Sequence, residues 1–493
     1  MAPPTQSAPL ASLLVARFLR SNNYTETLDA FIREAGLPSD AGETTEKEPA
    51  SEPAGVGRWT LEDIIQEKKT FDQSLTFERH DESVSAKDQW TSLAPSQPTV
   101  VGTPSSTNLL HVSVKPWKRD DKESSTSYVV ATGADKRLSL FNLDADQTVA
   151  ASMTQLSDSP ILSQTSVCDG KYQFLTGMSG KLLLVQNDQV IDSRKDHSKY
   201  TVQVAAYEDR DDGNVWIATA GWDAQVLVYH MKVPSPPDAP KIGEPVGAIK
   251  LPTNPESVLI TRNPDTQELT LLVSRRDSTH IYFYNLEALR STNDDTDNAA
   301  TVQCEEIGKQ NLAPHSNAWI AFSPSCLALS PHDPGLLAVA LSTMPHMKVM
   351  IIRLLFPSSS SSSTQDSTPQ TREERNESAS VSQATQAMAA LALQNREDAA
   401  IVIQTNTFAP QTPYSTPQVV WRPDGSGVWV NGDDGVIRGI EAKTGKIVTM
   451  LKNGHEVGSK VRSIWAGWVG EKEDSREEWV VSGGFDKRLI VWR

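Results

Sequence analysis

Aspartates at repeating positions are the first residues in this sequence that could carry out chemistry. Carboxylates can bind metal ions or transfer protons, provided that several of them converge on one point. Each of these aspartates lies within three residues after a glycine or a small residue and precedes an alternating apolar run: Asp135, Asp223, Asp277, Asp434 and Asp486. A regular repeat would spread them around the structure instead of gathering them. We therefore expect a structural role, in which each carboxylate accepts backbone N–H bonds within a turn.

The aspartates mark a repeated β unit that must position them. TGADKRLSLF from residue 132, TAGWDAQVLVY from residue 219 and the final SGGFDKRLIVWR each combine a turn with alternating apolar residues. Successive units lie about 40 residues apart, which is typical of a four-stranded blade repeated around an axis. Seven units can be counted; the sixth is expected to begin at residue 401, and the last is one strand short. Because an open sheet edge favours aggregation, we expect segment 98–102 to close the ring, with 74–78 as the alternative.

Histidines placed before several units complete the pattern. His197 precedes YTVQVAAY, and Gly454-His455 precedes KVRSIWAGW, while Trp492 ends the last unit. With the aspartate turns, these residues resemble the WD-repeat family over roughly residues 98–493. The resemblance implies a seven-bladed β-propeller in which an aspartate bonds to a histidine and a hydroxyl of its own blade. The pairs that it implies are His197 with Asp223 and His455 with Asp486.

The first residues, 8–38, have a helical pattern instead. Apolar residues recur at helical spacing along two segments: Leu14, Phe18 and Leu19 in the first, and Tyr24, Leu28, Phe31 and Ile32 in the second. Asn23 fits the turn between them, and Gly36 ends the second helix. Burying about eight large side chains yields roughly 12–24 kcal/mol, which is less than the cost of ordering the hairpin at roughly 1–2 kcal/mol per residue. Pairing of two hairpins in a four-helix bundle is therefore predicted.

The same residues show a second family likeness. FLRSNNY at 18–24 and TLDAFIRE at 27–34 resemble the LisH motif, a dimerising helical hairpin. This resemblance implies a homodimer, and docking of the hairpin on its own propeller is the alternative. The expected fold class is mainly β: a seven-bladed WD-repeat β-propeller with an N-terminal α-helical LisH hairpin.

Three further segments lie outside these patterns. Residues 39–57 are acidic and rich in Ala, Pro, Glu and Thr, which predicts a flexible linker. Residues 58–72 show the cap and charge order of a short helix. A Ser-rich stretch at about 357–398 is predicted to be a disordered insertion in the propeller.

Composition excludes several classes of protein. A net charge of −16 argues against a nucleic-acid-binding surface, which needs a concentrated basic face. No window approaches the roughly 20 apolar residues of a membrane helix. The three cysteines have neither zinc-site spacing nor a disulfide framework, so we expect no cofactor and a location in the cytoplasm, the nucleus or both.

A non-enzymatic scaffold that binds other proteins is the function these features favour. A propeller enzyme would need His, Asp or Glu converging from its inner strands, and QVAAY, VRSIW and ILSQT contain none. We therefore expect no enzymatic activity and no small-molecule substrate. Residues near the starts of the blades are proposed to contact partners: Tyr200, Trp319 and Arg462, although Trp319 could equally belong to the core. A subunit of a ubiquitin-ligase complex, substrate-recruiting or structural, is the alternative; a propeller-type enzyme is the less favoured one.

Overall fold

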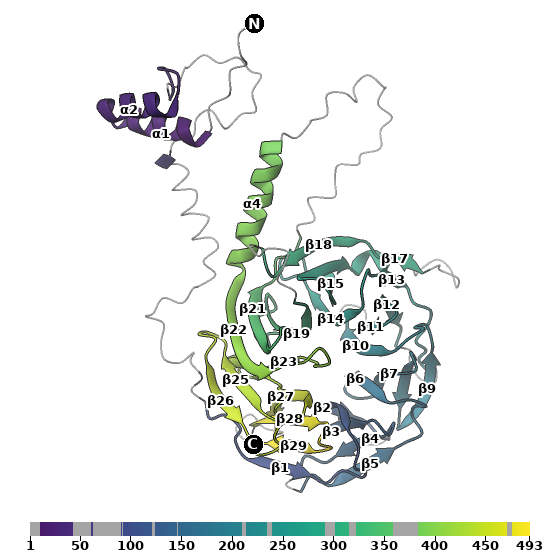
Figure 1. Ribbon diagram of the computed structural model, residues 1–493. Coiled ribbons are helices and arrows are strands. Elements are labelled where there is room, and N and C mark those ends of the chain that lie inside the picture. The colour runs from purple at the N-terminus through teal and green to yellow at the C-terminus, as the bar shows by residue number, and fades with distance from the viewer. Residues whose placement is uncertain are drawn as a thin grey trace, which may run out of the picture. The chain divides into compact units, whose positions relative to one another are not determined.

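The structure is a computed structural model (Figure 1). It describes residues 10–42, 61–62, 90, 92–120, 124–144, 146–209, 213–233, 239–290, 301–314, 322–357, 383–470 and 476–493. The chain divides into two units, one within residues 1–83 and one within residues 84–493. Among the helices that the structure describes, none combines the length and the apolar character needed to cross a bilayer.

The N-terminal unit is a helical hairpin made of α1 (Leu10–Ser21) and α2 (Thr25–Ala35). Asn23 adopts a positive φ of 58° in the turn, as its short polar side chain allows. Gly36 ends α2 in the left-handed conformation, with φ 64°, and its N–H donates to the carbonyl of Ile32. The predicted turn and helix end are therefore confirmed.

A short returning segment covers this hairpin. Arg20 donates to the carbonyl oxygens of Ser39 (3.0 Å) and Ala41 (3.2 Å), and Ala41 is buried with Leu28 in the hairpin core. Gly42 lies so close to α1 that a Cβ there would be 2.7 Å from a backbone nitrogen. The prediction that the flexible linker begins at residue 39 was therefore wrong for residues 39–42, because small residues packing on a backbone leave no apolar pattern.

The second unit is a ring of seven four-stranded antiparallel blades, one of which carries a short extra strand (Figure 1). In blades 1 to 6 the strands follow chain order outward from the centre, and in blade 7 the outermost strand is the first of the chain. Blade 1 contains β2 (Leu109–Trp117), β3 (Thr126–Gly133), β4 (Leu138–Phe141) and β5 (Val149–Met153). Blade 2 contains β6 (Ile161–Val167), β7 (Tyr172–Gly177), β8 (Leu182–Gln186) and β9 (Gln189–Arg194). Blade 3 contains β10 (Thr201–Glu208), β11 (Val215–Gly221), β12 (Gln225–Met231), β13 (Gly247–Lys250) and the extra β17 (Val302–Gln303).

The remaining blades follow the same plan. Blade 4 contains β14 (Pro255–Arg262), β15 (Leu269–Arg275), β16 (His280–Asn285) and, after the 3₁₀ helix η3 (Glu287–Leu289), β18 (Glu306–Asn311). Blade 5 contains β19 (Pro324–Leu329), β20 (Leu336–Leu341), β21 (His346–Arg353) and β22 (Ile401–Pro410). Blade 6 contains β23 (Val419–Trp421), β24 (Gly427–Val430), β25 (Ile437–Glu441) and β26 (Ile447–Leu451). Blade 7 contains β27 (Val461–Val469), β28 (Glu477–Gly484), β29 (Leu489–Trp492) and β1 (Pro98–Val101).

The core lies between the blades. Each of seven apolar clusters joins two neighbouring sheets, and together they fill all seven joints of the ring. The second strand of a blade is covered on both faces, so β7 and β11 are buried along their whole length. Such strands read as continuous apolar runs, which explains why the repeat shows so few fixed letters.

The ring closes through β1, as predicted for segment 98–102. This strand pairs antiparallel with β29, placing Pro98 opposite Trp492 and Val101 opposite Leu489. The backbone N–H groups of Ser96 and Gln97 both donate to the carbonyl of Arg493, at 2.7 and 3.0 Å. The last strand therefore has a partner on each side.

The chain just before β1 also packs on the propeller. The Trp90 ring lies against Gly427 and Gly439, at each of which a Cβ would come within 2.5 Å of it. The guanidinium carbon of Arg422 is 4.3 Å from the ring centroid, and the Trp429 ring makes an edge contact at 5.3 Å. We call residues 90 and 92–97 the strap, because they join blade 6 to the closing strand.

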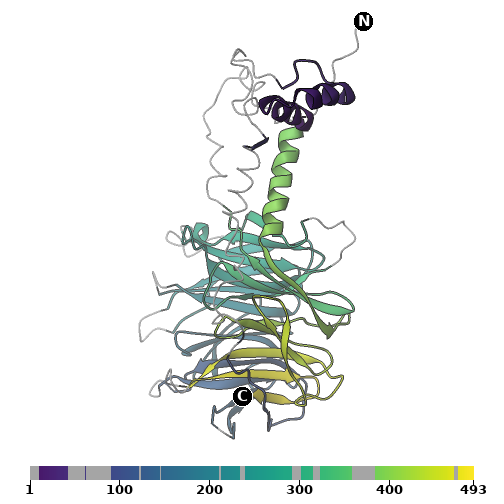
Figure 2. The same ribbon diagram turned by 90° about the vertical axis from the view of Figure 1, so that its left-hand side faces the viewer.

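The fifth blade corrects two predictions. β22, at 401–410, pairs with β21, so the sixth blade begins at β23 and not at residue 401. The insertion thus lies between two strands of one blade. Its last part forms α4 (Gln383–Ala399), which extends away from the ring (Figures 1 and 2), so the prediction of disorder was wrong for 383–398. Residues 358–382, and all of 58–72 except 61–62, lie outside the described residues.

Candidate functional site

The inner strands all begin on one side of the ring, which we call the leading face. In blade 3, Thr201 at the start of β10 pairs with Gly221 at the end of β11, so the turn 222–224 lies on this face. The N–H of Trp222 donates to the carbonyl of Tyr200 at 2.8 Å. The same bond recurs in other blades: Ala134 to Asn108, Met178 to Pro160, Arg276 to Asn254, Ser342 to Ser323 and Phe485 to Lys460. These first turn residues therefore occupy equivalent positions around the leading face.

Two blades contain the histidine networks implied by the sequence. In blade 3, His197 Nδ1 lies 3.0 Å from Asp223 Oδ1, and Nε2 lies 2.9 Å from Thr219 Oγ1. The backbone N–H of Ser198 donates to the same carboxylate at 2.9 Å. A Cβ at Gly221 would lie 2.1 Å from His197 Nδ1, so this position requires glycine.

Blade 7 repeats this arrangement. His455 Nδ1 lies 3.0 Å from Asp486 Oδ2, and Nε2 lies 2.9 Å from Ser482 Oγ, which also accepts from Trp492 Nε1 at 2.9 Å. Burial opposes ionisation of Asp486, but hydrogen bonds from His455 and from backbone N–H groups prevail and lower its pKa below the usual value. Each carboxylate thus binds the loop before the inner strand to the turn that follows the second strand. This role is structural.

The other repeated aspartates have different partners. Asp135 accepts from Ser105 Oγ at 2.6 Å, and Asp434 pairs with Arg438 at 2.6 Å. Asp277 is exposed, with φ 58°, and its N–H donates to Ser323 Oγ at 2.9 Å. The five aspartates thus lie in separate blades, and the structure does not bring them together.

An exposed aromatic group spans blades 3 and 4 on the leading face. Tyr200 and Trp222 are 43% and 38% exposed, with ring centroids 5.8 Å apart. The Arg276 guanidinium lies 5.9 Å from the Trp222 centroid and pairs with Glu256 at 2.7 Å. Burial raises the pKa of Glu256, although Arg276 opposes this shift. We call these four residues the aromatic patch; Phe485, also exposed, holds the position of Trp222 in blade 7.

A cleft of about 770 Å³ opens beside the patch, between blades 4 and 5. Its lining includes Glu256, Arg275, His280, Met344 and Pro413. Burial, aided by Lys309 and Arg275, lowers the pKa of His280. The lining thus combines charged side chains with a few apolar ones, among them Met344 and Phe322.

The structure places the three predicted partner-binding residues differently. Tyr200 belongs to the aromatic patch, Arg462 lies at the start of the inner strand β27, and Trp319 lies outside the described residues. Sequence reasoning missed Trp222 and Arg276. A signal for both existed, because each immediately precedes the aspartate of its repeat.

The inner strands contain charges that the sequence reading overlooked. Six of the seven have a register shift after their first residue, and Glu256 and Arg462 occupy equivalent bulge positions. His111 lies on β2, one residue after the corresponding bulge. The expectation that the inner strands lack His and acidic residues therefore holds for the three stretches inspected, but not for β2, β14 and the last residue of β10, Glu208.

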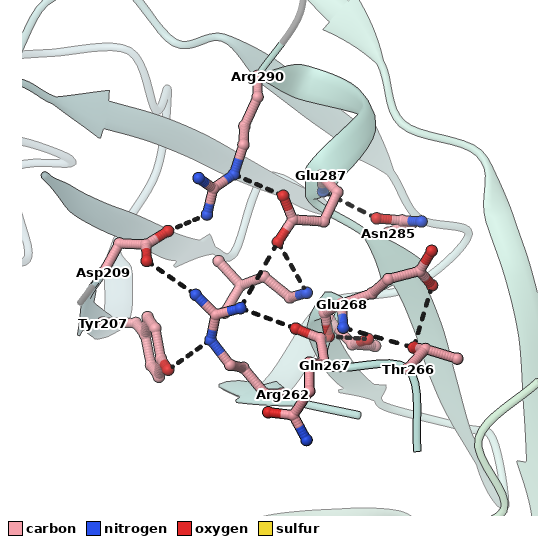
Figure 3. A network of polar contacts seen from close by, with 11 residues as sticks. Tyr207, Asp209, Arg262, Thr266, Gln267, Glu268, Asn285, Glu287 and Arg290 are labelled. Atoms are coloured by element: carbon pink, nitrogen blue, oxygen red, sulfur yellow. Dashed lines mark hydrogen bonds and ion pairs between the residues drawn. The ribbon is translucent and has the colours of Figure 1, made fainter. Parts of the chain in front are cut away.

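The opposite face contains a balanced polar network (Figure 3). Asp209, just after β10, accepts from Arg262 at 2.7 Å and from Arg290, and the Tyr207 hydroxyl accepts from Arg262 Nε at 3.0 Å. Glu287 pairs with Arg290 at 2.5 Å. Two arginines thus meet two carboxylates, and the network ties blade 3 to blade 4.

Metal ligands and thiols are further groups that could carry chemistry. In the part of the chain that the structure describes, no three His, Cys, Asp or Glu side chains are placed to hold a metal ion. Burial raises the pKa of Cys168 and of Cys304 to about 11, and Glu208 adds to the shift at Cys168. Both thiols are therefore protonated near neutral pH.

The hairpin uses most of its predicted dimerisation residues in its own core. Leu19, Leu28, Phe31 and Ile32 pack together there, and Leu14 is buried. Tyr24 differs, because it is 52% exposed. Its ring lies 6.4 Å from that of Phe18, which is half-buried. Among the described residues of this unit, Phe18 and Tyr24 thus present an accessible aromatic surface.

Comparison with known proteins matches both units. Residues 119–493 match the β-propeller domain of the UCP007778 family, and residues 11–39 match the LisH domain of that family. The uncharacterized protein YGR117C of Saccharomyces cerevisiae is 23% identical over 382 residues, which cover 72% of this chain and 76% of the yeast protein. With the seven-bladed ring, these matches confirm the predicted hairpin and propeller.

Proposed function

Because this chain belongs to the UCP007778 family, which joins a LisH domain to a β-propeller domain, we propose that it is a non-catalytic scaffold that binds other proteins. The observation that carries the proposal is the aromatic patch. It presents two exposed aromatic rings and an arginine on the leading face, where the turns of the blades meet solvent. Aromatic residues and arginine are the side chains that most often dominate binding energy in protein interfaces.

Dimerisation through the hairpin is the second part of the proposal. A unit of two helices and a returning segment has a small core, and association is a usual way to stabilise such units. Phe18 and Tyr24 supply an accessible aromatic surface for a second copy. Two propellers held in one particle would bind a repeated partner with increased avidity.

The double variant Phe18→Asp/Tyr24→Asp is expected to halve the mass of the full-length particle, because two carboxylates cannot be buried without partners. Light scattering across a dilution series measures this mass. Thr25→Asp, which adds a charge at the exposed start of α2, should leave the dimer intact. Leu28→Asp is unsuitable, since Leu28 is needed for the hairpin itself. A wild type with the mass of one chain would refute the dimer.

The variant Tyr200→Ala/Trp222→Ala is expected to lose bound proteins, since truncating a central aromatic residue commonly costs about 2 kcal/mol or more, roughly 30-fold in Kd. Quantitative affinity capture from cell extract followed by mass spectrometry measures the loss. Trp468→Ala is the matched control: Trp468 is also exposed, but lies toward the far end of β27. If both variants retain the same partners as the wild type, the patch is not the docking site.

A further inference from the structure

The inner strands contain few charged side chains, and these are unevenly distributed. Away from the last residue of each strand, the acidic, basic and histidine residues on the seven inner strands are His111 and Lys115 on β2, Glu256 on β14 and Arg462 on β27. All other interior positions are apolar, hydroxyl or amide residues. These strands surround the centre of the ring (Figure 1).

Three of the four form one cationic cluster. β2 and β27 are neighbours, and the N–H of Val112 donates to Ser463 Oγ at 3.0 Å. Residues 111 and 115 lie on the same face of β2, because side chains alternate along a strand. Arg462 directly precedes Ser463. Both Lys115 and Arg462 act electrostatically on His111. We call His111, Lys115 and Arg462 the axial basic cluster.

The cluster has no counter-charge of its own in the described part of the chain. His111 Nε2 is buried without a hydrogen-bond partner. Across the described residues, neither the Lys115 ammonium nor the Arg462 guanidinium makes a hydrogen bond or ion pair. Glu256 acts on Arg462 from a distance, but its carboxylate is paired with Arg276 at 2.7 Å.

Lys115 and Arg462 are half-buried, and withdrawing an unpaired cation from water is costly. Burial lowers the pKa of Lys115 and of Arg462, and Glu256 only partly offsets the shift at Arg462. Burial, Lys115 and Arg462 together lower the pKa of His111 to about 4. Elsewhere the protein balances partly buried arginines, as in the network of Figure 3, where two carboxylates meet two guanidinium groups. An anion would restore the same balance here.

We propose that the axial basic cluster binds a single phosphate group between β2 and β27. The guanidinium of Arg462 and the ammonium of Lys115 supply charge-assisted hydrogen bonds, and the His111 imidazole supplies a further N–H donor. With a net charge of −16, the whole protein repels anions at long range, so local contacts must provide the affinity. The group can come from inorganic phosphate or from a small phosphomonoester.

Thermal unfolding of the full-length protein, titrated with inorganic phosphate at ionic strength held constant with chloride, tests the proposal. The Tm of the wild type should rise as binding to the folded state saturates. Arg462→Gln and Lys115→Gln should each bind phosphate at least tenfold more weakly. Lys199→Gln removes the same charge from an exposed site and should respond like the wild type. Glycerol phosphate in place of phosphate shows whether the site accepts an ester.

A second measurement needs no variant of the cluster. With ¹³C-labelled histidine, NMR titration of the wild type should show the pKa of His111 rising when phosphate is present, because the anion offsets two neighbouring cations. A wild type whose Tm and His111 titration are both indifferent to phosphate overturns the proposal. Equal responses of wild type, Arg462→Gln and Lys115→Gln would assign any phosphate effect to another part of the surface and would overturn it as well.

Discussion

Glu478→Gln is expected to lower the free energy of unfolding by about 3–5 kcal/mol, the cost of leaving a buried charge without its partner. Arg422 is fully buried, and its Nε donates to the Glu478 carboxylate at 3.0 Å. Trp429 Nε1 donates to the same carboxylate, also at 3.0 Å. The substitution keeps the shape of the side chain but removes the buried carboxylate that pairs with Arg422 and, among the described residues, leaves only Asp424, which is more exposed and lies 3.3 Å from Arg422 Nη1. Denaturant titration of the full-length protein measures the change.

The neighbouring residue provides a control for this variant. Glu477 is exposed, and among the described residues its side chain makes only a long contact with Trp479 Nε1, at 3.5 Å, so Glu477→Gln should alter stability by less than about 0.5 kcal/mol. A second variant separates charge from packing. Arg422→Met/Glu478→Leu removes both charges and should cost less than Glu478→Gln alone, because apolar replacements of a buried pair are often tolerated. If Glu478→Gln unfolds with the wild-type free energy, the pair does not hold blades 6 and 7 together.

The pair also shows where sequence reasoning stops. Glu478 and Arg422 lie 56 residues apart, in the second strand of one blade and just after the inner strand of another. Neither belongs to a local pattern. The turns around Asp223 and Asp486 could be predicted because their partners, His197 and His455, lie within about 30 residues in a repeated order. The closing strand 98–101 could be predicted because an incomplete last blade demands a partner.

Other features depend on spatial neighbours that the sequence does not place next to each other. β22 follows α4 and therefore resembles the start of a new unit, whereas its hydrogen bonds assign it to the blade before the insertion. His111 and Arg462 belong to opposite ends of the propeller sequence, and only ring closure makes their strands neighbours. Because its residues come from strands at opposite ends of the propeller sequence, the axial basic cluster has no local sequence signal.

Trp90→Ala is expected to cost about 3 kcal/mol of stability, as for other large aromatic residues that leave a cavity on truncation. The ring fills the space above Gly427 and Gly439 and lies 4.3 Å from the Arg422 guanidinium carbon. Its backbone N–H donates to Glu441 at 3.2 Å. Since the strap continues directly into β1, the loss should also increase hydrogen exchange in β29, the strand that β1 covers.

A double-mutant cycle with Gly439→Ala tests whether the glycine serves to admit this ring. A Cβ at residue 439 would lie 2.5 Å from Trp90 Cη2, so Gly439→Ala should destabilise the wild type by displacing the strap. In the Trp90→Ala background part of that clash is removed. The loss of unfolding free energy caused by Gly439→Ala should then be smaller than in the wild type by about 1 kcal/mol or more, a coupling typical of residues in contact. Additive effects would mean that Gly439 is required for its contacts with Thr449 and Trp429 alone. The strap would then be held by Arg422 and Glu441, and hydrogen exchange in β29 would respond to Arg422→Met in the same way as to Trp90→Ala.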